Sequence, residues 1–278
     1  MPLTVNTNVA SLNAQRNLTS SQSSLNTSLQ RLSSGLRVNS AKDDAAGLAI
    51  AERMNAQVRG LTVGIRNAGD GISLAQTAEG ALGSVTESLQ RMRELAVQSA
   101  NATNSTADRA SLDAEYQQLA TEIGRVLAGT EFNGSAILAG GAGAQDFQVG
   151  PNNTVNDRIT VTTVNMSTNA DITAVTGAAV SGADGTAGQA AIGLIDTALD
   201  TVNSERATLG AAQSRMETAV RSLETTRENT AAARGRIMDA DFAAETANLT
   251  RAQILQQAGV AMLSQANALP QSALALLQ

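Results

Sequence analysis

The chain contains no cysteine, no histidine and no tryptophan among its 278 residues. Without histidine or cysteine it cannot form a Ser-His-Asp or Cys-His nucleophile, a zinc site of imidazole and thiolate ligands, or a disulfide. Any bound metal would have to be a hard cation held by oxygen ligands. The sequence also has no phosphate-binding loop and no dinucleotide fingerprint. We therefore expect no cofactor, no metal site, no catalytic residues and no enzymatic activity.

Large side chains are almost as scarce. Aromatic residues make up 1% of the chain, although 42% of its residues are hydrophobic. A compact globule of this length fills its core with more large side chains than that. The hydrophobic residues include many alanines, which suit closely spaced helices, and only three prolines interrupt the chain. This composition favours an elongated helical protein.

The charge balance excludes two classes of partner. The net charge is -6 at pH 7, which argues against binding to nucleic acid or to an anionic membrane surface. No stretch approaches 18 consecutive apolar residues, so we expect no membrane insertion. The first residues show no basic segment followed by an apolar one, so no cleavable signal peptide is visible. We expect a protein that is cytoplasmic or is exported by another route.

Apolar residues recur in alternating steps of three and four along both flanks of the chain. The longest such series is Met54, Val58, Leu61, Ile65, Ala68, Ile72 and Ala75, and a comparable series runs from Ile192 to Leu223. This spacing is typical of a coiled-coil seam. The middle of the chain is rich in Thr, Val, Asn and Gly and predicts hairpins and turns. We expect a mainly α protein, with a long antiparallel coiled-coil rod built from both chain ends and a small β-hairpin tip.

Local residue chemistry predicts the helix boundaries. Gly35 and Asn39 are expected to interrupt the first helix. Ser40 is expected to cap the next helix, with Asp43 and Asp44 giving it a negative first turn. Ser105 and Asp108 have the spacing of a capping box. Asp239 and Asp241 are expected to start the last helix, after a long helix that ends near residue 235.

The terminal segments carry apolar stripes opposite faces of Asn, Gln, Ser and Thr. A unit of only two helices cannot bury both sides of its apolar surface. We therefore expect these segments to associate with other copies of the chain, whereas an isolated hairpin of two helices is the alternative. The expected self-assembly seams are Leu25, Leu29, Leu32, Leu36, Leu249, Leu255, Met262 and Leu269.

The acids at Asp239, Asp241 and Glu245 are the strongest candidates for a catalytic or metal-binding cluster. Acidic residues are also expected at the start of a helix, where they interact favourably with the helix dipole. Nothing aromatic or glycine-rich nearby indicates a pocket. We therefore interpret these acids as helix-capping residues.

Several long strings resemble bacterial flagellins. They are SSGLRVNSAKDDAAGLAI at 33–50, RNAGDGISLAQTAEGAL at 66–82, QRMRELAVQSAN at 90–101 and ENTAAARGRIMDADFAAETANLTRAQILQQAGVAMLSQAN at 228–267. The resemblance covers nearly all of both helical flanks, in the same order. The intervening region is short, so the large outer variable domains of longer flagellins are missing.

The resemblance implies a structural subunit of the extracellular bacterial flagellar filament, which serves swimming motility and is exported unfolded by the flagellar type III system. It implies that residues 1–40 and 240–278 form an inner tube, disordered in the monomer and ordered on polymerisation. Residues 44–130 and 189–235 would form an outer rod, with a β-hairpin and short variable region at 131–188. The implied partners are further copies, the filament cap and junction proteins, and an export chaperone that binds through Leu255, Met262 and Leu269.

The resemblance also implies detection by the host Toll-like receptor for flagellin. The matching positions are Gln90, Arg91, Glu94, Leu95, Gln98 and Glu115, whereas Leu119 replaces a residue that is often basic in the family. Ion pairs within the filament, or simple solvation, would account for the same charged residues.

Two related proteins are the alternatives. A hook–filament junction protein is similar at both chain ends, but the unbroken strings at 33–50 and 228–267 favour a filament subunit. A flagellin that carries a zinc peptidase is excluded, because its HExxH motif requires histidine.

Overall fold

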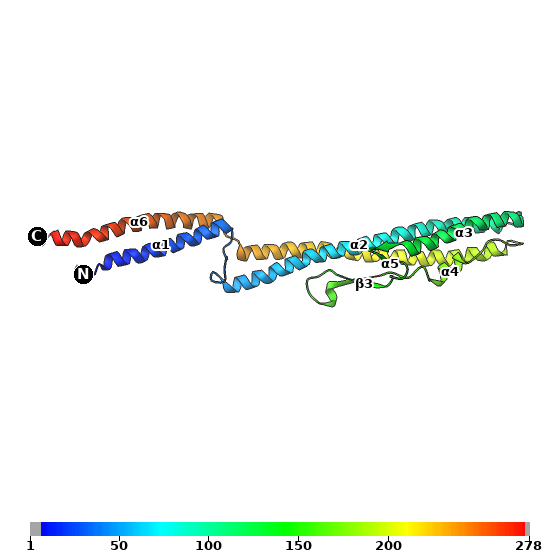
Figure 1. Cartoon of the computed structure of the whole chain (residues 1–278), viewed down its shortest axis with the longest axis horizontal. Coiled ribbons are helices and arrows are strands. Elements are labelled where there is room, and N and C mark those ends of the chain that lie inside the picture. The colour runs from blue at the N-terminus through cyan, green and yellow to red at the C-terminus, as the bar shows by residue number, and fades with distance from the viewer. Residues whose placement is uncertain (1–6, 276–278) are drawn as a thin grey trace. The chain divides into compact units, whose positions relative to one another are not determined.

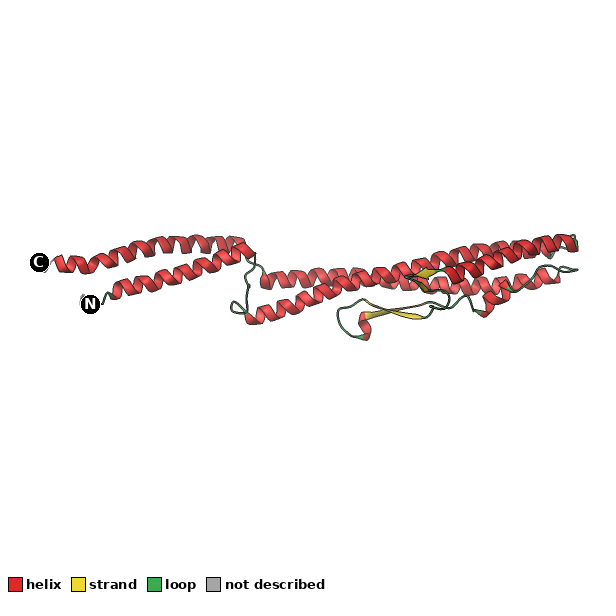
Figure 2. Cartoon of the chain, in the orientation of Figure 1, coloured by secondary structure: helices red, strands yellow, loops and turns green. Residues whose placement is uncertain are grey.

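The computed structural model describes residues 7–275, with side chains as far as residue 268. Helices dominate the described chain, and the strands form two small antiparallel hairpins (Figure 2). The elements in order are α1 (Val9–Ser34), α2 (Ala45–Ser99), α3 (Thr106–Gly129), β1 (Glu131–Phe132), β2 (Ser135–Ala136), β3 (Ala144–Gln148), a 3-10 turn η1 (Val155–Asp157), β4 (Arg158–Thr162), α4 (Ala170–Thr176), α5 (Thr186–Met238) and α6 (Phe242–Ala275). The predicted mainly α architecture with a small β-hairpin region is confirmed.

The chain divides into two compact units. The first comprises residues 1–56 and 229–278, and the second comprises residues 57–228. The division falls inside α2 and inside α5, so each long helix contributes to both units. The predicted filament domains, 1–40 with 240–278, 44–130 with 189–235, and 131–188, stay a prediction.

In the first unit, α1 and α6 lie side by side and antiparallel (Figure 1). The linkers that follow α1 and precede α6 are joined by backbone hydrogen bonds, from Arg37 N to Met238 O and from Ala240 N to Gly35 O. Gly35 ends α1 in the left-handed conformation, with φ of 72°, as the sequence predicts. The Asp241 carboxylate accepts hydrogen bonds from the backbone of residues 243 and 244 and thereby caps α6.

The start of α2 differs from the prediction. Asp44, and not Ser40, is the N-cap, because its carboxylate accepts a hydrogen bond from Gly47 N at 2.7 Å. Ser40 instead donates its hydroxyl to the carboxylate of Asp43, and this hydrogen bond lowers the pKa of Asp43. The N-cap of α2 therefore lies at Asp44, later in the chain than the predicted Ser40.

The second unit holds the large hydrophobic core. Its fully buried side chains come from α2, α3, α5 and the segments between them, and include Leu82, Leu89, Leu95, Tyr116, Ile123 and Leu209. Ion pairing of Arg93 with Asp196 and a hydrogen bond from Gln213 to Glu79 join α2 to α5 outside this core. The predicted capping box of Ser105 and Asp108 opens α3.

The β-hairpins lie in the second unit. Asn133 and Gly134 both have positive φ and form the tight turn between β1 and β2. The β3–β4 hairpin is anchored on α2, where Asn67 Nδ2 donates to Gln148 O at 2.8 Å. At Gly64 of α2 a Cβ atom would lie 1.9 Å from Val149 O, so only glycine permits this approach. The sequence analysis did not predict α4, which is capped by Asn169 and buries Ile172 and Val175.

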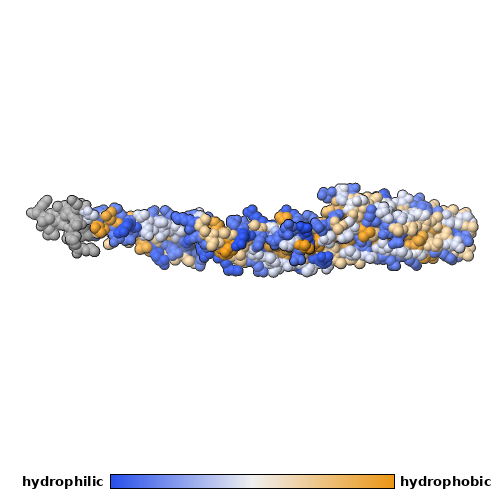
Figure 3. Space-filling model, turned by 90° about the horizontal axis from the view of Figure 1, so that it is seen from below, coloured by the Kyte–Doolittle hydropathy of each residue, from blue (hydrophilic) through white to orange (hydrophobic). Residues whose placement is uncertain are grey.

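The surface is mixed in character. Hydrophobic side chains appear as separate patches among hydrophilic ones (Figure 3). Within the described part of the chain, no helix combines the length and the hydrophobicity that a bilayer crossing requires.

Candidate assembly and recognition surfaces

The interface between α1 and α6 is made mainly of small and polar residues. The side chains it buries most completely are Ser11, Leu25, Ser28, Glu245, Ala252 and Ala266. Hydrogen bonds cross it from Asn8 Nδ2 to Ala266 O, from Ser11 Oγ to Asn267 Oδ1, and from Gln256 Nε2 to Gln22 Oε1. Because small side chains make up most of this interface, the two helices pair while leaving several of their larger apolar groups uncovered.

The expected seam residues therefore point in different directions. Leu25 is buried, and Leu32, Leu36 and Leu249 are half-buried. The exposed fraction is 48% for Leu29, 52% for Leu255 and 63% for Met262. The side chain of Leu269 lies outside the described residues. The predicted stripe is thus a partly covered surface of the pair, and Leu29, Leu255 and Met262 face outward.

An apolar hollow of about 620 Å³ opens between the two helices. Gly259 brings them close at this point, since a Cβ there would lie 3.2 Å from Leu18 Cδ1. Leu255, Ala258 and Met262 of α6 line the hollow. It leaves apolar surface open along the same face as the outward seam residues.

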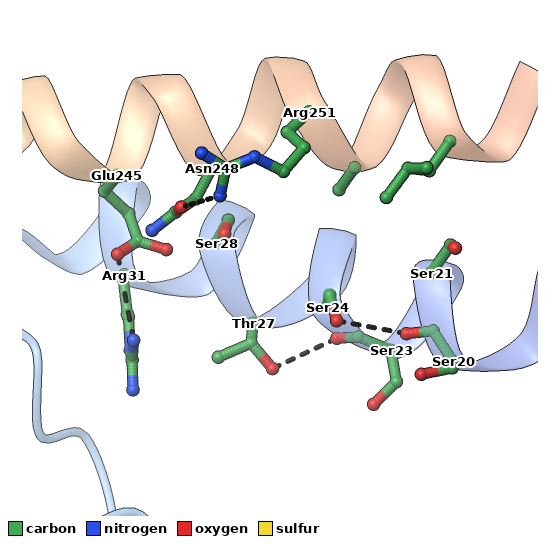
Figure 4. A pocket seen from close by; sticks show the side chains of 12 residues that line it. Ser20, Ser21, Ser23, Ser24, Thr27, Ser28, Arg31, Glu245, Asn248 and Arg251 are labelled. Carbon is green, nitrogen blue, oxygen red and sulfur yellow. Dashed lines mark hydrogen bonds and ion pairs between the residues drawn. The ribbon is translucent and has the colours of Figure 1, made fainter. Parts of the chain in front are cut away.

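A second hollow of about 450 Å³ lies nearer the linkers and is polar (Figure 4). Its wall on α1 consists of hydroxyl side chains, and Arg31 and Glu245 meet across it with 3.7 Å between Nη1 and Oε2. Arg251 lines the same hollow and donates to Asn248 Oδ1 at 3.0 Å. This feature was not predicted, because no residue pattern in the sequence distinguishes the hydroxyl face of α1 from ordinary polar surface.

The expected receptor positions form an ion-paired patch on α2 and α3. Arg91 contacts Glu94 Oε2 at 2.7 Å and Glu115 Oε1 at 2.8 Å. Hydrogen bonds with Glu94 and Glu115 raise the pKa of Arg91 above its ordinary value. Gln90 and Gln98 are exposed on the same face of α2. The structure therefore brings five of the six expected residues together at the surface.

Leu95 is the exception, because it is only 1% exposed and belongs to the core of the second unit. In its place Arg93 and the exposed Val97 line a shallow hollow with Gln90, Glu94 and Gln98. The sequence analysis missed both residues. Val97 could have been found from the sequence, because it is a single valine on a helix face that is otherwise polar.

The acids considered as a catalytic cluster have separate structural roles. Asp241 caps α6, whereas Glu245 is buried against Arg31. The capping role follows from the position of Asp241 at the start of the helix, whereas the contact of Glu245 with Arg31 depends on the pairing of α1 with α6.

Comparison with known sequences decides the family. The sequence model of the bacterial flagellin N-terminal helical region matches residues 5–142, and that of the C-terminal helical region matches residues 192–277. The chain belongs to the bacterial flagellin family. A flagellin of Halalkalibacterium halodurans is 47% identical over 274 residues, which are 99% of each chain. Flagellin A of Vibrio cholerae is 37% identical over an alignment of 379 positions that covers all of both chains.

Solved structures agree with this assignment. The crystal structure of Bacillus cereus flagellin is 33% identical and aligns with a TM-score of 0.50, covering 61% of this chain and 94% of that one. A Vibrio parahaemolyticus structure assigned as a flagellar hook-associated protein aligns with a TM-score of 0.60 at 14% identity, covering 71% of this chain and all of the other. The second likeness shows a shared fold only.

This flagellin is therefore a structural subunit of the flagellar filament, a structural protein that serves motility, and its place is the extracellular filament. The relative of nearly equal length confirms that it is a short member of the family. The Vibrio alignment is longer than the 278 residues of this chain, so that relative contains sequence that is missing here.

Proposed function

We propose that this flagellin polymerises by burying the outward apolar side chains of α1 and α6 against neighbouring copies. Residues 1–40 and 240–278 form the inner layer of the filament, and residues 44–130 and 189–235 form the outer rod. The observation that supports this most strongly is the exposure of Leu29, Leu255 and Met262 on helices that bury mainly serine and alanine between them. Fully burying one such side chain stabilises by about 1.5–3 kcal/mol, so half-exposed residues gain roughly 1 kcal/mol each in the polymer.

Seeded growth tests this proposal. A Leu255→Gln/Met262→Gln variant should fail to elongate preformed seeds, as followed by light scattering and electron microscopy. Val155→Gln is the matched control, because Val155 is an exposed apolar residue of the second unit. Growth of the double variant at the wild-type rate would remove the proposed seam.

The same surface suits the export chaperone. Before polymerisation the apolar face around Leu255 and Met262 is exposed to solvent. A chaperone that binds this face and Leu269 prevents premature assembly. Export then proceeds with the chain unfolded through the type III apparatus, and the absence of cysteine means that no disulfide opposes unfolding. The cap and junction proteins bind the same helix faces at the two ends of the filament. Titrating the chaperone against the Leu255→Gln/Met262→Gln variant should show weakened binding, with Val155→Gln unchanged.

The ion-paired patch is proposed as the contact for the host Toll-like receptor. Its surface members are Gln90, Arg91, Glu94, Gln98 and Glu115, and Leu95 only supports them from below. Arg91→Ala removes the centre of the patch and should weaken receptor activation by the monomer by on the order of tenfold. Arg125→Ala is the control, because Arg125 also forms an exposed ion pair with an acid three residues away. Equal signalling by both variants would refute the assignment.

The hook–filament junction protein remains the related alternative. The hook-associated structure from Vibrio parahaemolyticus resembles this chain in fold alone, at 14% identity, whereas the flagellin relative is 47% identical over nearly the whole chain. Seeds distinguish the two functions, because a filament subunit elongates them to fibres of micrometre length and a junction protein stops at a few layers.

A further inference from the structure

The Arg31–Glu245 pair is incompletely bonded within its own chain. The closest approach of its charged atoms is 3.7 Å, which is longer than a hydrogen bond, and the two side chains are 31% and 10% exposed. Arg31 Nε is buried and has no partner. Charged groups held away from water are normally hydrogen-bonded, and a pair without such bonds is a net cost to stability. The pair therefore has donor and acceptor capacity that this chain alone does not use.

The rest of the hollow has the same dual character (Figure 4). The hydroxyls of Ser24 and Thr27 donate to backbone carbonyls of their own helix, at Ser20 O and Ser23 O. Their oxygen atoms keep lone pairs that can accept from a group in the hollow. Arg251 adds a second guanidinium beside the hydroxyl wall. Each wall of the cavity thus presents both kinds of group, because Arg31 and the hydroxyl oxygens come from α1, and Arg251 and the Glu245 carboxylate come from α6.

This arrangement selects one chemical class of side chain. A carboxylate in the hollow would face Glu245, and an ammonium or guanidinium would face Arg31 and Arg251. A primary carboxamide satisfies both sides, because its oxygen accepts from the Arg31 guanidinium while its NH₂ group donates to the Glu245 carboxylate. We propose that the hollow between Arg31 and Glu245 receives a glutamine or asparagine side chain from a neighbouring copy of this flagellin.

A second copy is the occupant that the composition of these helices favours. The four charged residues of α1 and α6 are Arg16, Arg31, Glu245 and Arg251, and three of them line this hollow. The exposed surface of the same helices is instead rich in carboxamides, at Gln15, Gln30, Gln253, Gln257 and Gln265. The inference rests on the proposed assembly through α1 and α6. It adds a polar contact that fixes the register of neighbouring copies, which apolar burial alone does not do.

Two charge-removing changes test the hollow in the full-length chain. Glu245→Gln removes the acceptor charge and Arg31→Gln removes the guanidinium, and each should slow elongation of wild-type seeds at least tenfold. Arg16→Gln is the matched control, because Arg16 is an exposed arginine of α1 outside the hollow. Helix content and thermal unfolding of the monomer are measured in parallel, since a purely intramolecular ion pair would change these and not the growth rate. Wild-type growth of both hollow variants would overturn the inference.

The side chain that occupies the hollow is identified by a rescue experiment, in which a growth defect of one monomer variant is corrected by a second substitution in the seed protein. Each exposed glutamine of α1 and α6 is changed to glutamate and each exposed asparagine to aspartate, and one such variant should fail to elongate wild-type seeds because its carboxylate meets Glu245. That variant should recover on seeds made from the Glu245→Gln protein, and the pairing is also tested with seed and monomer exchanged. Absence of any rescued pair would overturn the proposal. So would a filament structure with an inorganic anion, water or an apolar side chain in the hollow. Failure of the wild type to grow would instead refute the assembly proposal itself.

Discussion

The two units of the molecule use the same apolar periodicity in opposite ways. In the second unit the seam residues Leu82, Leu89 and Leu209 are fully buried within the chain. In the first unit the interface of α1 and α6 encloses serine and alanine, while Leu255 and Met262 face outward. A repeat of three and four residues therefore shows that a helix has an apolar face, but not whether that face is covered by the same chain or by another.

Removing the terminal helices tests this comparison most severely. A chain lacking residues 1–34 and 242–278 should form no filaments, because the surfaces proposed for assembly are gone. It should keep a cooperative thermal transition, since the large core lies within residues 57–228. Both are measured on one preparation, by seeded growth and by circular dichroism. Tubes formed by the truncated chain would show that the terminal helices are dispensable.

A matched pair of leucines sharpens the contrast. Leu209→Ala leaves a cavity in the core of the second unit and should destabilise the monomer by about 2–5 kcal/mol. Leu255→Ala removes a half-exposed side chain and should change monomer stability by less than about 0.5 kcal/mol. Leu255→Ala should raise the critical concentration for polymerisation while its monomer stays folded. Leu209→Ala should raise it only by unfolding the monomer. Urea denaturation of the two monomers gives the first comparison, and equal values would mean that the units do not differ.

The features that could be predicted from the sequence depend on neighbouring residues along the chain. Gly35, Ser105 and Asp241 act at helix ends through bonds to residues within four positions, so the sequence contains all of the required information. The N-cap at Asp44 was not predicted, because Ser40 is also a residue type that caps helices and lies just before it in the chain. In the structure Ser40 instead donates to Asp43, and Asp44 accepts the capping bond. The short helix α4 was missed because only two buried residues, Ile172 and Val175, mark it.

The candidate sites depend on the rotation of each helix, which local sequence does not fix. Leu95 and Val97 are two positions apart on α2, yet one is buried and the other exposed. The sequence resemblance placed the first at the receptor patch and passed over the second. In the same way, Arg31 and Glu245 are far apart in sequence, and only the pairing of α1 with α6 brings them to one hollow.

A smaller change tests whether open space in the first unit is needed for assembly. Ala258 lines the apolar hollow between α1 and α6. Ala258→Leu should leave the monomer intact but overpack the assembled interface, at about 1–3 kcal/mol per subunit, and give straight or absent filaments. Ala207→Leu, at an exposed alanine of α5, is the control. Normal filaments from the Ala258 variant would show that the hollow stays empty in the polymer.

The smallest expected effect concerns the one buried carboxylate in the α5 seam of the second unit. Glu205 accepts a hydrogen bond from Val164 N at 3.0 Å. Burial raises its pKa, and the Val164 hydrogen bond only partly opposes this. Because the folded state holds this proton more tightly than the unfolded state does, the stability that Glu205 contributes is fully present below its unfolded pKa. That contribution is lost as pH rises through the folded pKa.

Exposed acids such as Asp184 and Asp196 have lowered pKa values and act in the opposite direction, so the total stability does not isolate Glu205. The informative quantity is the difference in unfolding free energy between the wild type and Glu205→Gln, which titrates only Glu205. As pH falls from 8 to about 4, this difference should shift in favour of the wild type, by less than the cost of Leu209→Ala. A difference that is constant with pH would show that Glu205 is solvated in the folded unit, and that the second unit is less completely closed than its leucines indicate.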